Sequence, residues 1–284
     1  MGSLTLLKPG TQTLVQDRGR AGLAFYAIPR SGPLDPRSAE LAHALLDNPA
    51  DAPLLECHFT PPEIRFDTWA TICLTGADMR WRLDGKKARR NEALPVEPGA
   101  VLTGQPATEG CRAYLAVQGE IQTDRTWGSA ACYPLAGFGG NGGKPLTAGD
   151  TITWREPEKP ATPIRFDTST PLTTDRLQLT PGPEQDWLTE ASRTALYEQP
   201  FEVTPQSNRM GARLAGPELS TDGRALDASV PVLPGIVQLL PSGQCIVVLA
   251  DGQTTGGYPR IGYVPSASLC SFAQLAQGQR FWWS

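Results

Sequence analysis

Short apolar segments separated by turn residues run through the chain, and this pattern restricts its fold more than any other feature. Between residues 54 and 104 these segments end at turn sequences such as Thr75-Gly76, Asp84-Gly85 and Pro98-Gly99. Such spacing is typical of hairpins in a β-barrel or β-sandwich. The 29 glycines and 27 prolines among 284 residues argue against a bundle of long helices. We therefore predict a mainly β protein with a few short helices.

The length of 284 residues favours two domains. A glycine turn that leads into a short apolar strand occurs twice in each half, at Pro98-Gly99, Ala148-Gly149, Pro234-Gly235 and Gln277-Gly278. Residues 155–163 lack apolar periodicity and are rich in proline, which is typical of a linker. The sequence thus predicts an N-terminal domain over 1–160 and a C-terminal domain over 161–284.

Apolar residues at helical spacing predict three helices, over about 36–47, 184–196 and 267–276. The first has the strongest start signal, because Asp35 is a good N-cap and Pro36 suits the first helical position. The final residues 280–283 predict an edge strand whose aromatic side chains pack inward.

Charge and hydropathy exclude several classes of partner. The formal net charge is −4, and most basic residues are scattered, apart from Lys86-Lys87 and Arg89-Arg90 beside the Asp84-Gly85 turn. Nucleic acid is therefore not an expected partner. No apolar run approaches the ~18 residues of a membrane span, and the N-terminus lacks the apolar region of a signal peptide. We expect a cytoplasmic protein with no membrane partner.

The cysteines and histidines do not form a metal-binding pattern. Six cysteines lie far apart, with no C-x-x-C motif and no clustering with His43 or His58. In a cytoplasmic chain such cysteines are expected to be small buried hydrophobic residues. No metal site is predicted from them.

The stretch from Asp251 to Arg260 is the first candidate for a binding site. It follows the apolar run 245–250, which predicts a buried strand, and it contains Gln253, Thr254, Thr255 and Tyr258 around the pair Gly256-Gly257. Glycine lets the backbone come close to a ligand, so this stretch can present several hydrogen-bonding groups as a pocket wall. An ordinary turn between two strands explains the composition equally well.

Two further segments carry candidate site residues. Arg30, Ser31 and Asp35 precede the first predicted helix, whose N-terminal N–H groups favour an anion, although Asp35 can also be only a cap. Asn208 and Arg209 form a predicted turn, and Arg209 is either a planar clamp for a carboxylate or phosphate or a surface arginine. The glycine-rich segment 136–145 is not a P-loop, since Lys144 is followed by Pro145.

Five segments together resemble the biotin-dependent carboxyltransferase family, which includes the C subunit of 5-oxoprolinase, the second-subunit-like domain of allophanate hydrolase and the carboxyltransferase region of urea carboxylase. The segments are residues 28–35 (IPRSGPLD), 114–119 (YLAVQG), 136–140 (AGFGG), 207–211 (SNRMG) and 251–260 (DGQTTGGYPR). Among the departures from the family pattern, Ala130 replaces an arginine, which removes an anion contact.

This resemblance implies two cyclophilin-like β-barrel domains with a groove between them. In the 5-oxoprolinase branch it implies a hydrolase complex that opens 5-oxoproline to glutamate with ATP. The implied partners are a cyclophilin-like subunit of the B type and a LamB/YcsF-like subunit of the A type. Two alternatives stay open: a carboxyltransferase that uses biotin from another polypeptide, for example toward urea, and a non-catalytic regulatory subunit.

The chemistry of lactam opening suggests roles for the candidate residues. Phosphorylation of the amide oxygen and attack by water require an anion clamp, hydrogen-bond donors and a base. We assign Arg209 to a carboxylate or phosphate, and Asp35 or Asp251 to proton handling or Mg²⁺. The remaining predicted substrate-binding residues are Arg30, Ser31, Asn208, Gln253, Thr254, Thr255, Gly256 and Tyr258.

Overall fold

The computed structural model describes residues 1–156, 166 and 172–284. The described chain divides into two compact units, one made of Met1–Arg20 and Ser31–Leu172 and the other of Ala21–Arg30 and Thr173–Ser284. The predicted boundary at residue 160 lies outside the described residues. The predicted fold class is confirmed, since both units are built from curled β-sheets with a few short helices.

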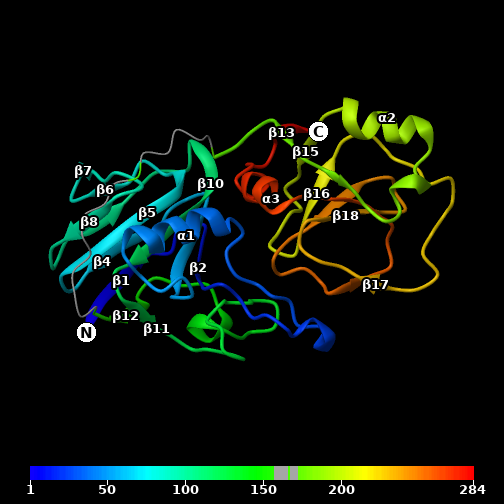
Figure 1. The fold of residues 1–284 in the computed structure, drawn as a ribbon. Helices are drawn as coiled ribbons and strands as arrows, with labels where there is room; N and C mark the ends of the chain where they lie inside the picture. The colour runs from blue at the N-terminus through cyan, green and yellow to red at the C-terminus, as the bar shows by residue number, and fades with distance from the viewer. Residues whose placement is uncertain (157–165, 167–171) are drawn as a thin grey trace. The chain divides into compact units, whose positions relative to one another are not determined.

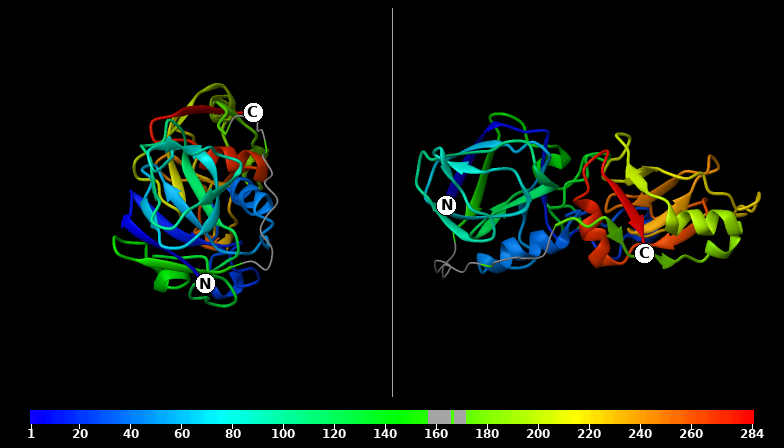
Figure 2. Two further views of the ribbon diagram at one scale, coloured as in Figure 1. Left: turned by 90° about the vertical axis from the view of Figure 1, so that its left-hand side faces the viewer. Right: turned by 90° about the horizontal axis from the view of Figure 1, so that it is seen from above.

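The N-terminal unit contains a seven-stranded and a five-stranded sheet, with strand orders β11-β12-β1-β4-β9-β6-β7 and β2-β3-β10-β5-β8 (Figure 1). Its strands are β1 (Gly2–Lys8), β2 (Gln12–Gln16), β3 (Leu54–His58), β4 (Glu63–Phe66), β5 (Ala70–Asp78), β6 (Arg82–Leu83), β7 (Lys86–Lys87), β8 (Ala93–Val96), β9 (Val101–Thr103), β10 (Glu109–Val117), β11 (Glu120–Gln122) and β12 (Thr151–Arg155). It also holds helix α1 (Pro36–Leu45) and the 3₁₀ turn η2 (Gly140–Gly143). Seen from its end, the strands curl around a common centre (Figure 2, left).

Alternation along β5 and β10 explains why both faces of the five-stranded sheet are buried. Ile72 and Leu74 point into the core between the two sheets, whereas Cys73 between them contacts the cluster under α1. The opposite face of β10 puts Tyr114 and Ala116 under the same helix. Because successive side chains of a strand point to opposite faces, these strands appear in the sequence as nearly continuous apolar runs.

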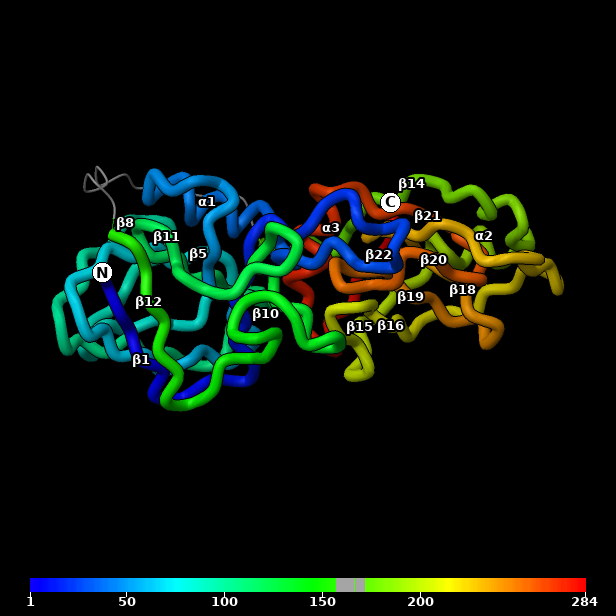
Figure 3. Tube along the Cα trace, turned by 90° about the horizontal axis from the view of Figure 1, so that it is seen from below, coloured from blue at the N-terminus to red at the C-terminus, as the bar shows by residue number. Residues whose placement is uncertain are grey.

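The C-terminal unit is organised by an eight-stranded sheet of order β13-β22-β15-β16-β19-β18-β21-β14, with a separate pair β17-β20 (Figure 3). Its strands are β13 (Arg176–Leu177), β14 (Thr180–Pro181), β15 (Phe201–Val203), β16 (Gly211–Ala215), β17 (Val230–Pro231), β18 (Ile236–Leu239), β19 (Cys245–Val248), β20 (Thr255–Gly256), β21 (Arg260–Tyr263) and β22 (Arg280–Trp283). Its helices are α2 (Glu190–Glu198) and α3 (Ser266–Ala273), and its 3₁₀ turns are η1 (Ala24–Tyr26) and η3 (Gln185–Trp187).

An aromatic cluster packs α3 and β22 together in the C-terminal unit. Phe272 of α3 stacks on Trp283 with ring centroids 6.2 Å apart and meets Phe281 edge-on at 5.6 Å. The inward packing predicted for residues 280–283 is confirmed for Phe281 and Trp283, which are fully buried. Their strand is not an edge, however, because β22 pairs with β13 on one side and β15 on the other.

Two of the three predicted helices are confirmed nearly in full, and the third begins later than predicted. Helix α2 starts at Glu190, because Thr189 is its N-cap and accepts a hydrogen bond from the Ser192 N–H at 3.2 Å. The preceding Leu188 has extended backbone angles and separates α2 from the 3₁₀ turn η3. No helix among the described residues is long and apolar enough to cross a membrane.

Candidate functional site

In the N-terminal unit, Asp35 caps helix α1 with both of its carboxylate oxygens. Oδ1 accepts the Ser38 N–H at 3.2 Å, and Oδ2 accepts the Ser38 hydroxyl at 2.6 Å. The Asp35 side chain is fully buried. The capping interpretation of Asp35 therefore agrees with its contacts, while its role in proton handling stays a prediction.

A buried tyrosine and glutamate fix the chain just before this helix. The Tyr114 hydroxyl donates to Glu56 Oε2 at 2.9 Å and accepts the Asp35 N–H at 2.8 Å, and the Leu34 N–H donates to the same Glu56 oxygen at 2.8 Å. Burial, together with the charges of Glu56 and Asp35, raises the pKa of Tyr114 well above its usual range. The phenol thus stays protonated and remains a donor at neutral pH.

Ser31 is a candidate residue with unusual geometry. Its φ is 57°, its side chain is only 5% exposed, and its buried Oγ forms no hydrogen bond with any residue that the structure describes. The neighbouring Arg30 is exposed and belongs to the C-terminal unit, whereas Ser31 belongs to the N-terminal unit. A buried hydroxyl in this state is a candidate ligand contact.

In the C-terminal unit, Arg209 and Asp251 form a buried, two-pronged ion pair. Arg209 Nε donates to Asp251 Oδ2 at 2.7 Å and Nη2 donates to Oδ1 at 3.2 Å, although the residues are 42 positions apart. Their side chains are 9% and 3% exposed. The Asp251 N–H also donates to the Arg209 carbonyl at 3.0 Å. The structure therefore joins two predicted site residues.

This pairing changes what each residue can contribute. Asp251 offsets the charge of the Arg209 guanidinium, and both Asp251 oxygens already accept hydrogen bonds from it. Asn208 is also engaged locally, since its Oδ1 accepts the Met210 N–H at 2.8 Å. The anion clamp at Arg209 and the proton-handling role of Asp251 stay predictions, and the observed contacts favour a role in holding the two loops together.

Gln238 is a residue that sequence reasoning missed. It lies on β18, is 1% exposed, and its Oε1 accepts a hydrogen bond from Gln253 Nε2 at 3.1 Å. Its own Nε2 is buried and has no hydrogen-bond partner within the described chain. The signal in the sequence was a lone glutamine inside the apolar segment Ile236–Leu239.

The glycines of this stretch permit close approach of neighbouring chains. A Cβ at position 256 would lie 2.6 Å from Gln238 Nε2, and one at position 252 would lie 2.7 Å from the Met210 carbonyl oxygen. Thr255 and Gly256 form β20 and pair with β17, while the Thr254 carbonyl accepts the Val232 N–H at 2.9 Å. The pocket-wall interpretation therefore gains a buried amide donor that faces Gly256.

The end of the same stretch is anchored by a second ion pair. Arg260 donates through Nη2 to Glu184 Oε1 at 2.8 Å and through Nε to Oε2 at 3.0 Å. These hydrogen bonds hold the pKa of Glu184 below its usual value and raise the pKa of Arg260. Tyr258, before this anchor, is 41% exposed and is thus accessible.

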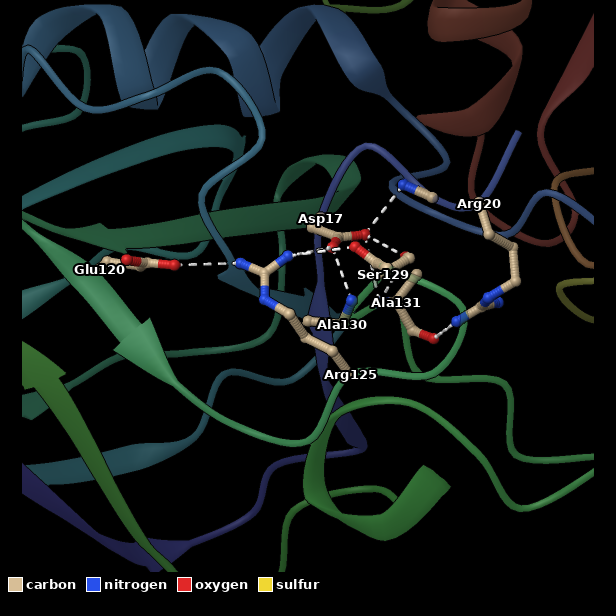
Figure 4. Close-up of polar contacts among 9 residues, drawn as sticks. Asp17, Arg20, Glu120, Arg125, Ser129, Ala130 and Ala131 are labelled. Carbon is tan, nitrogen blue, oxygen red and sulfur yellow. Dashed lines mark hydrogen bonds and ion pairs between the residues drawn. The ribbon is translucent and has the colours of Figure 1, made fainter. Parts of the chain in front are cut away.

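A third polar cluster, in the N-terminal unit, is centred on Asp17 (Figure 4). Its buried carboxylate accepts the Ser129 hydroxyl at 2.5 Å, the Ala130 N–H at 2.6 Å and the Ala131 N–H at 3.1 Å. Arg125 Nη1 lies 3.5 Å from the same carboxylate, and Arg125 Nη2 lies 3.2 Å from Glu120. Asp17 therefore fixes the loop 125–131.

Ala130 is the position where the family pattern has an arginine. Its side chain is fully buried in the core of the N-terminal unit, and its backbone is held from both sides by Asp17 and by the Gly140 N–H. Nearby, Arg20 Nη2 donates to the Ala131 carbonyl, and the Arg20 guanidinium carbon lies 4.8 Å from the centre of the Phe138 ring. Arg20 is thus a second arginine bound to this loop.

The glycine-rich segment 136–145 uses its backbone donors within the protein. The Gly140 N–H donates to the Ala130 carbonyl at 2.8 Å, the Asn141 N–H to Thr123 Oγ1 at 3.2 Å, and the Gly142 N–H to Asp124 at 3.0 Å. These donors are not directed at a common point, in agreement with the prediction that this loop is not a P-loop.

Metal-binding groups are sparse in the described part of the chain. No three His, Cys, Asp or Glu side chains there come together as a metal site. All six cysteines are buried and free, which confirms their prediction as buried residues.

Comparisons with known proteins extend over nearly the whole chain. Residues 26–284 match a family model described as "Carboxyltransferase domain, subdomain A and B". The chain is 36% identical to the C subunit of 5-oxoprolinase from Escherichia coli over 97% of this chain and 89% of that protein, and 30% identical to its Haemophilus influenzae counterpart over 97% and 88%. The crystal structure of Kluyveromyces lactis urea carboxylase superposes with a TM-score of 0.90 at 26% identity, over 99% of this chain and 27% of that chain.

Proposed function

Because the chain belongs to the carboxyltransferase family of subdomains A and B, we propose that it is a subunit of an ATP-dependent 5-oxoprolinase that hydrolyses 5-oxo-L-proline to L-glutamate. The supporting observation is the 36% identity to the C subunit of a 5-oxoprolinase over 89% of that protein's length. Urea amidolyase of Saccharomyces cerevisiae is 27% identical, and the chain covers 16% of it.

The urea-carboxylase alternative requires a biotin carrier from elsewhere. Biotin is attached to a lysine in an Ala-Met-Lys sequence, and the three methionines here, Met1, Met79 and Met210, do not lie in one. A carboxyltransferase role would thus depend on a separate biotinylated polypeptide.

The proposed reaction activates a poor electrophile. Transfer of the γ-phosphoryl group of ATP to the lactam oxygen gives ADP and an activated carbon. Water then attacks this carbon, the ring C–N bond breaks, the nitrogen takes up a proton, and phosphate is released as the carboxylate forms. Donors to the lactam oxygen and exclusion of bulk water are the contributions expected from the protein.

Gln238 and Gln253 are the groups best placed for such a donor role. They are joined through their amides, and the Gln238 Nε2 donor is buried beside Gly256. In this proposal they contact the lactam, Thr254, Thr255 and Tyr258 contact other polar atoms of the substrate, and the Arg209–Asp251 pair positions the loop that carries them.

ATP is a second substrate of the proposed complex, with Mg²⁺ as its counterion. The glycine-rich segment is not a suitable phosphate site, since its N–H groups are used internally. We propose that a B-type subunit and a LamB/YcsF-like subunit of the A type complete the complex, in keeping with the subunit names of the relatives.

The test is release of glutamate from 5-oxoproline by the three co-purified subunits, with this chain included or omitted. We expect release only with ATP and with this chain present. Gln238→Leu should lower kcat/KM about 100-fold, the usual effect of removing one donor to a developing oxyanion. Gln206→Leu, at an exposed position of the same unit, is the control.

Two results would contradict this proposal. Glutamate release that does not require the chain would remove it from the reaction. Unchanged turnover by Gln238→Leu in an intact complex would instead indicate that the chain is non-catalytic.

A further inference from the structure

A second concave site lies in the N-terminal unit, on residues that the proposed function does not use. A pocket of about 680 Å³ opens beside the β6–β7 hairpin, at the end of the seven-stranded sheet (Figure 1). Its volume is within the usual range for sites of small molecules. It is lined by one carboxylate, five cationic side chains and four other residues: Asp78, Arg80, Arg82, Lys87, Arg89, Arg90, Trp81, Ala88, Asn91 and Phe166.

The positive charge of this pocket is largely uncompensated, although the chain as a whole has a net charge of −4. Arg90 is held by the Gly76 carbonyl and lies 3.5 Å from Glu109 and 3.9 Å from Asp78. Lys87 and Arg89 form no ion pair with any residue in the described ranges. Both are exposed, so their charges are available to a ligand.

Trp81 supplies an independent observation that points to a ligand. It lines the pocket, is 1% exposed, and its indole Nε1 is buried without a hydrogen-bond partner among residues 1–156, 166 and 172–284. A buried donor without an acceptor costs about 1–3 kcal/mol and calls for an explanation. An oxygen of a bound anion would supply the acceptor.

Protection of a sheet edge explains only part of this arrangement. Charged side chains, lysine above all, commonly prevent edge strands from pairing with other chains, and Lys86 and Lys87 lie on the edge strand β7. That role requires no concave site, and it does not account for a buried indole donor.

We propose that this pocket binds a small molecule bearing two or more linked phosphate groups. Guanidinium groups bind phosphate oxygens through paired N–H donors, and a compact polyanion can contact several of them at once. The proposal is independent of the 5-oxoprolinase assignment, because it rests on other residues.

The test is isothermal titration of the full chain with tripolyphosphate and pyrophosphate, with citrate as a carboxylate of similar charge. We expect saturable binding of the phosphate compounds that weakens with added salt. The double variant Lys87→Ala/Arg89→Ala should weaken binding at least tenfold. Lys86→Ala is the matched control, since Lys86 is exposed on the same hairpin and does not line the pocket.

The indole signal of Trp81 gives a second readout. In ¹⁵N NMR spectra one of the seven tryptophan indole signals should be missing in Trp81→Phe, and tripolyphosphate should shift that signal in the unmodified chain. Absence of saturable binding at millimolar tripolyphosphate would overturn the proposal. Equal losses in Lys86→Ala and in the double variant would also overturn it, because they would indicate attraction by the surface charge alone, and binding of citrate in place of phosphate would refute the ligand class.

Discussion

Tyr114 shows how a single buried hydroxyl connects three parts of the N-terminal unit. It bonds the Asp35 N–H before α1 and the carboxylate of Glu56 on β3, from its own position on β10. The partners are 79 and 58 residues away in the chain. The sequence predicted the Asp35 cap from neighbouring residues, but this network depends on strand pairing that no local pattern encodes.

Removal of that hydroxyl should destabilise the N-terminal unit. Tyr114→Phe leaves a buried N–H and a buried carboxylate each short of one partner, so we expect a loss of about 2 kcal/mol in the free energy of unfolding. Urea denaturation measures this change. The control Tyr26→Phe, at a 69% exposed tyrosine, should change stability by less than about 0.5 kcal/mol, and equal effects would show that the network is not stabilising.

His43 should make the protein sensitive to mild acid. Burial lowers the pKa of His43 from 6.5 to about 4, with Arg18 adding to the shift, while the Ala52 backbone and Asp51 oppose it. The unfolded chain therefore binds more protons than the folded chain between these values, and stability falls as the pH drops from about 6.5 to about 4. The loss should reach up to about 3 kcal/mol.

The measurement for His43 is the urea midpoint as a function of pH. His43→Gln should flatten the decline between pH 6.5 and 4, and the control His58→Gln should retain it. An unchanged slope in His43→Gln would show that other groups cause the acid sensitivity.

Among the elements, the local signals of the sequence were reliable and the non-local ones were not. Helix α1 starts where Asp35 and Pro36 predicted, whereas α2 starts late because Thr189 provides a competing cap. The position of β22 inside its sheet depends on partners from distant parts of the chain. The link between Gln238 and Gln253 was missed for the same reason, since it joins β18 to a loop after β19.

The Arg209–Asp251 pair should be worth far more than a surface pair of equal length. Arg209→Ala leaves a buried carboxylate unpaired, and we expect a loss of about 3–5 kcal/mol in the free energy of unfolding. Lys8→Ala is the matched control, because Lys8 also lies 2.7 Å from its partner Glu63 but is 74% exposed, and it should cost less than about 1 kcal/mol.

A double variant separates the charge from the packing at this pair. Arg209→Met/Asp251→Leu should recover much of the stability lost in Arg209→Ala, because neither charge is then left unpaired. If Arg209→Ala cost no more than Lys8→Ala, the pair would not hold the two loops together.

At the scale of the whole molecule, the sequence predicted the class of fold and the family better than the course of the chain. The turn spacing sufficed for a mainly β protein, because hairpin turns are local. It contained no sign that Ala21–Arg30 belongs to the compact unit formed by Thr173–Ser284, since such an assignment depends on tertiary contacts.

Burial of all six cysteines predicts an unreactive native protein. Burial raises the pKa of Cys57, Cys73 and Cys245 to about 12 and also raises that of Cys111. Because the thiolate is the reactive form, a disulfide reagent at pH 8 should label none of the six within minutes, and all six in guanidinium chloride. Rapid labelling of a native thiol would contradict the packing of the strand that carries it.

The most direct test of the proposed function compares substrates in the reconstituted complex. Phosphate release from ATP is measured with 5-oxoproline, or with urea plus bicarbonate and a biotinylated carrier. We predict that 5-oxoproline stimulates phosphate release, that one glutamate forms per phosphate, and that both signals vanish when this chain is omitted. Stimulation by urea and the carrier, with none by 5-oxoproline, would contradict the assignment and place the chain with the urea carboxylases.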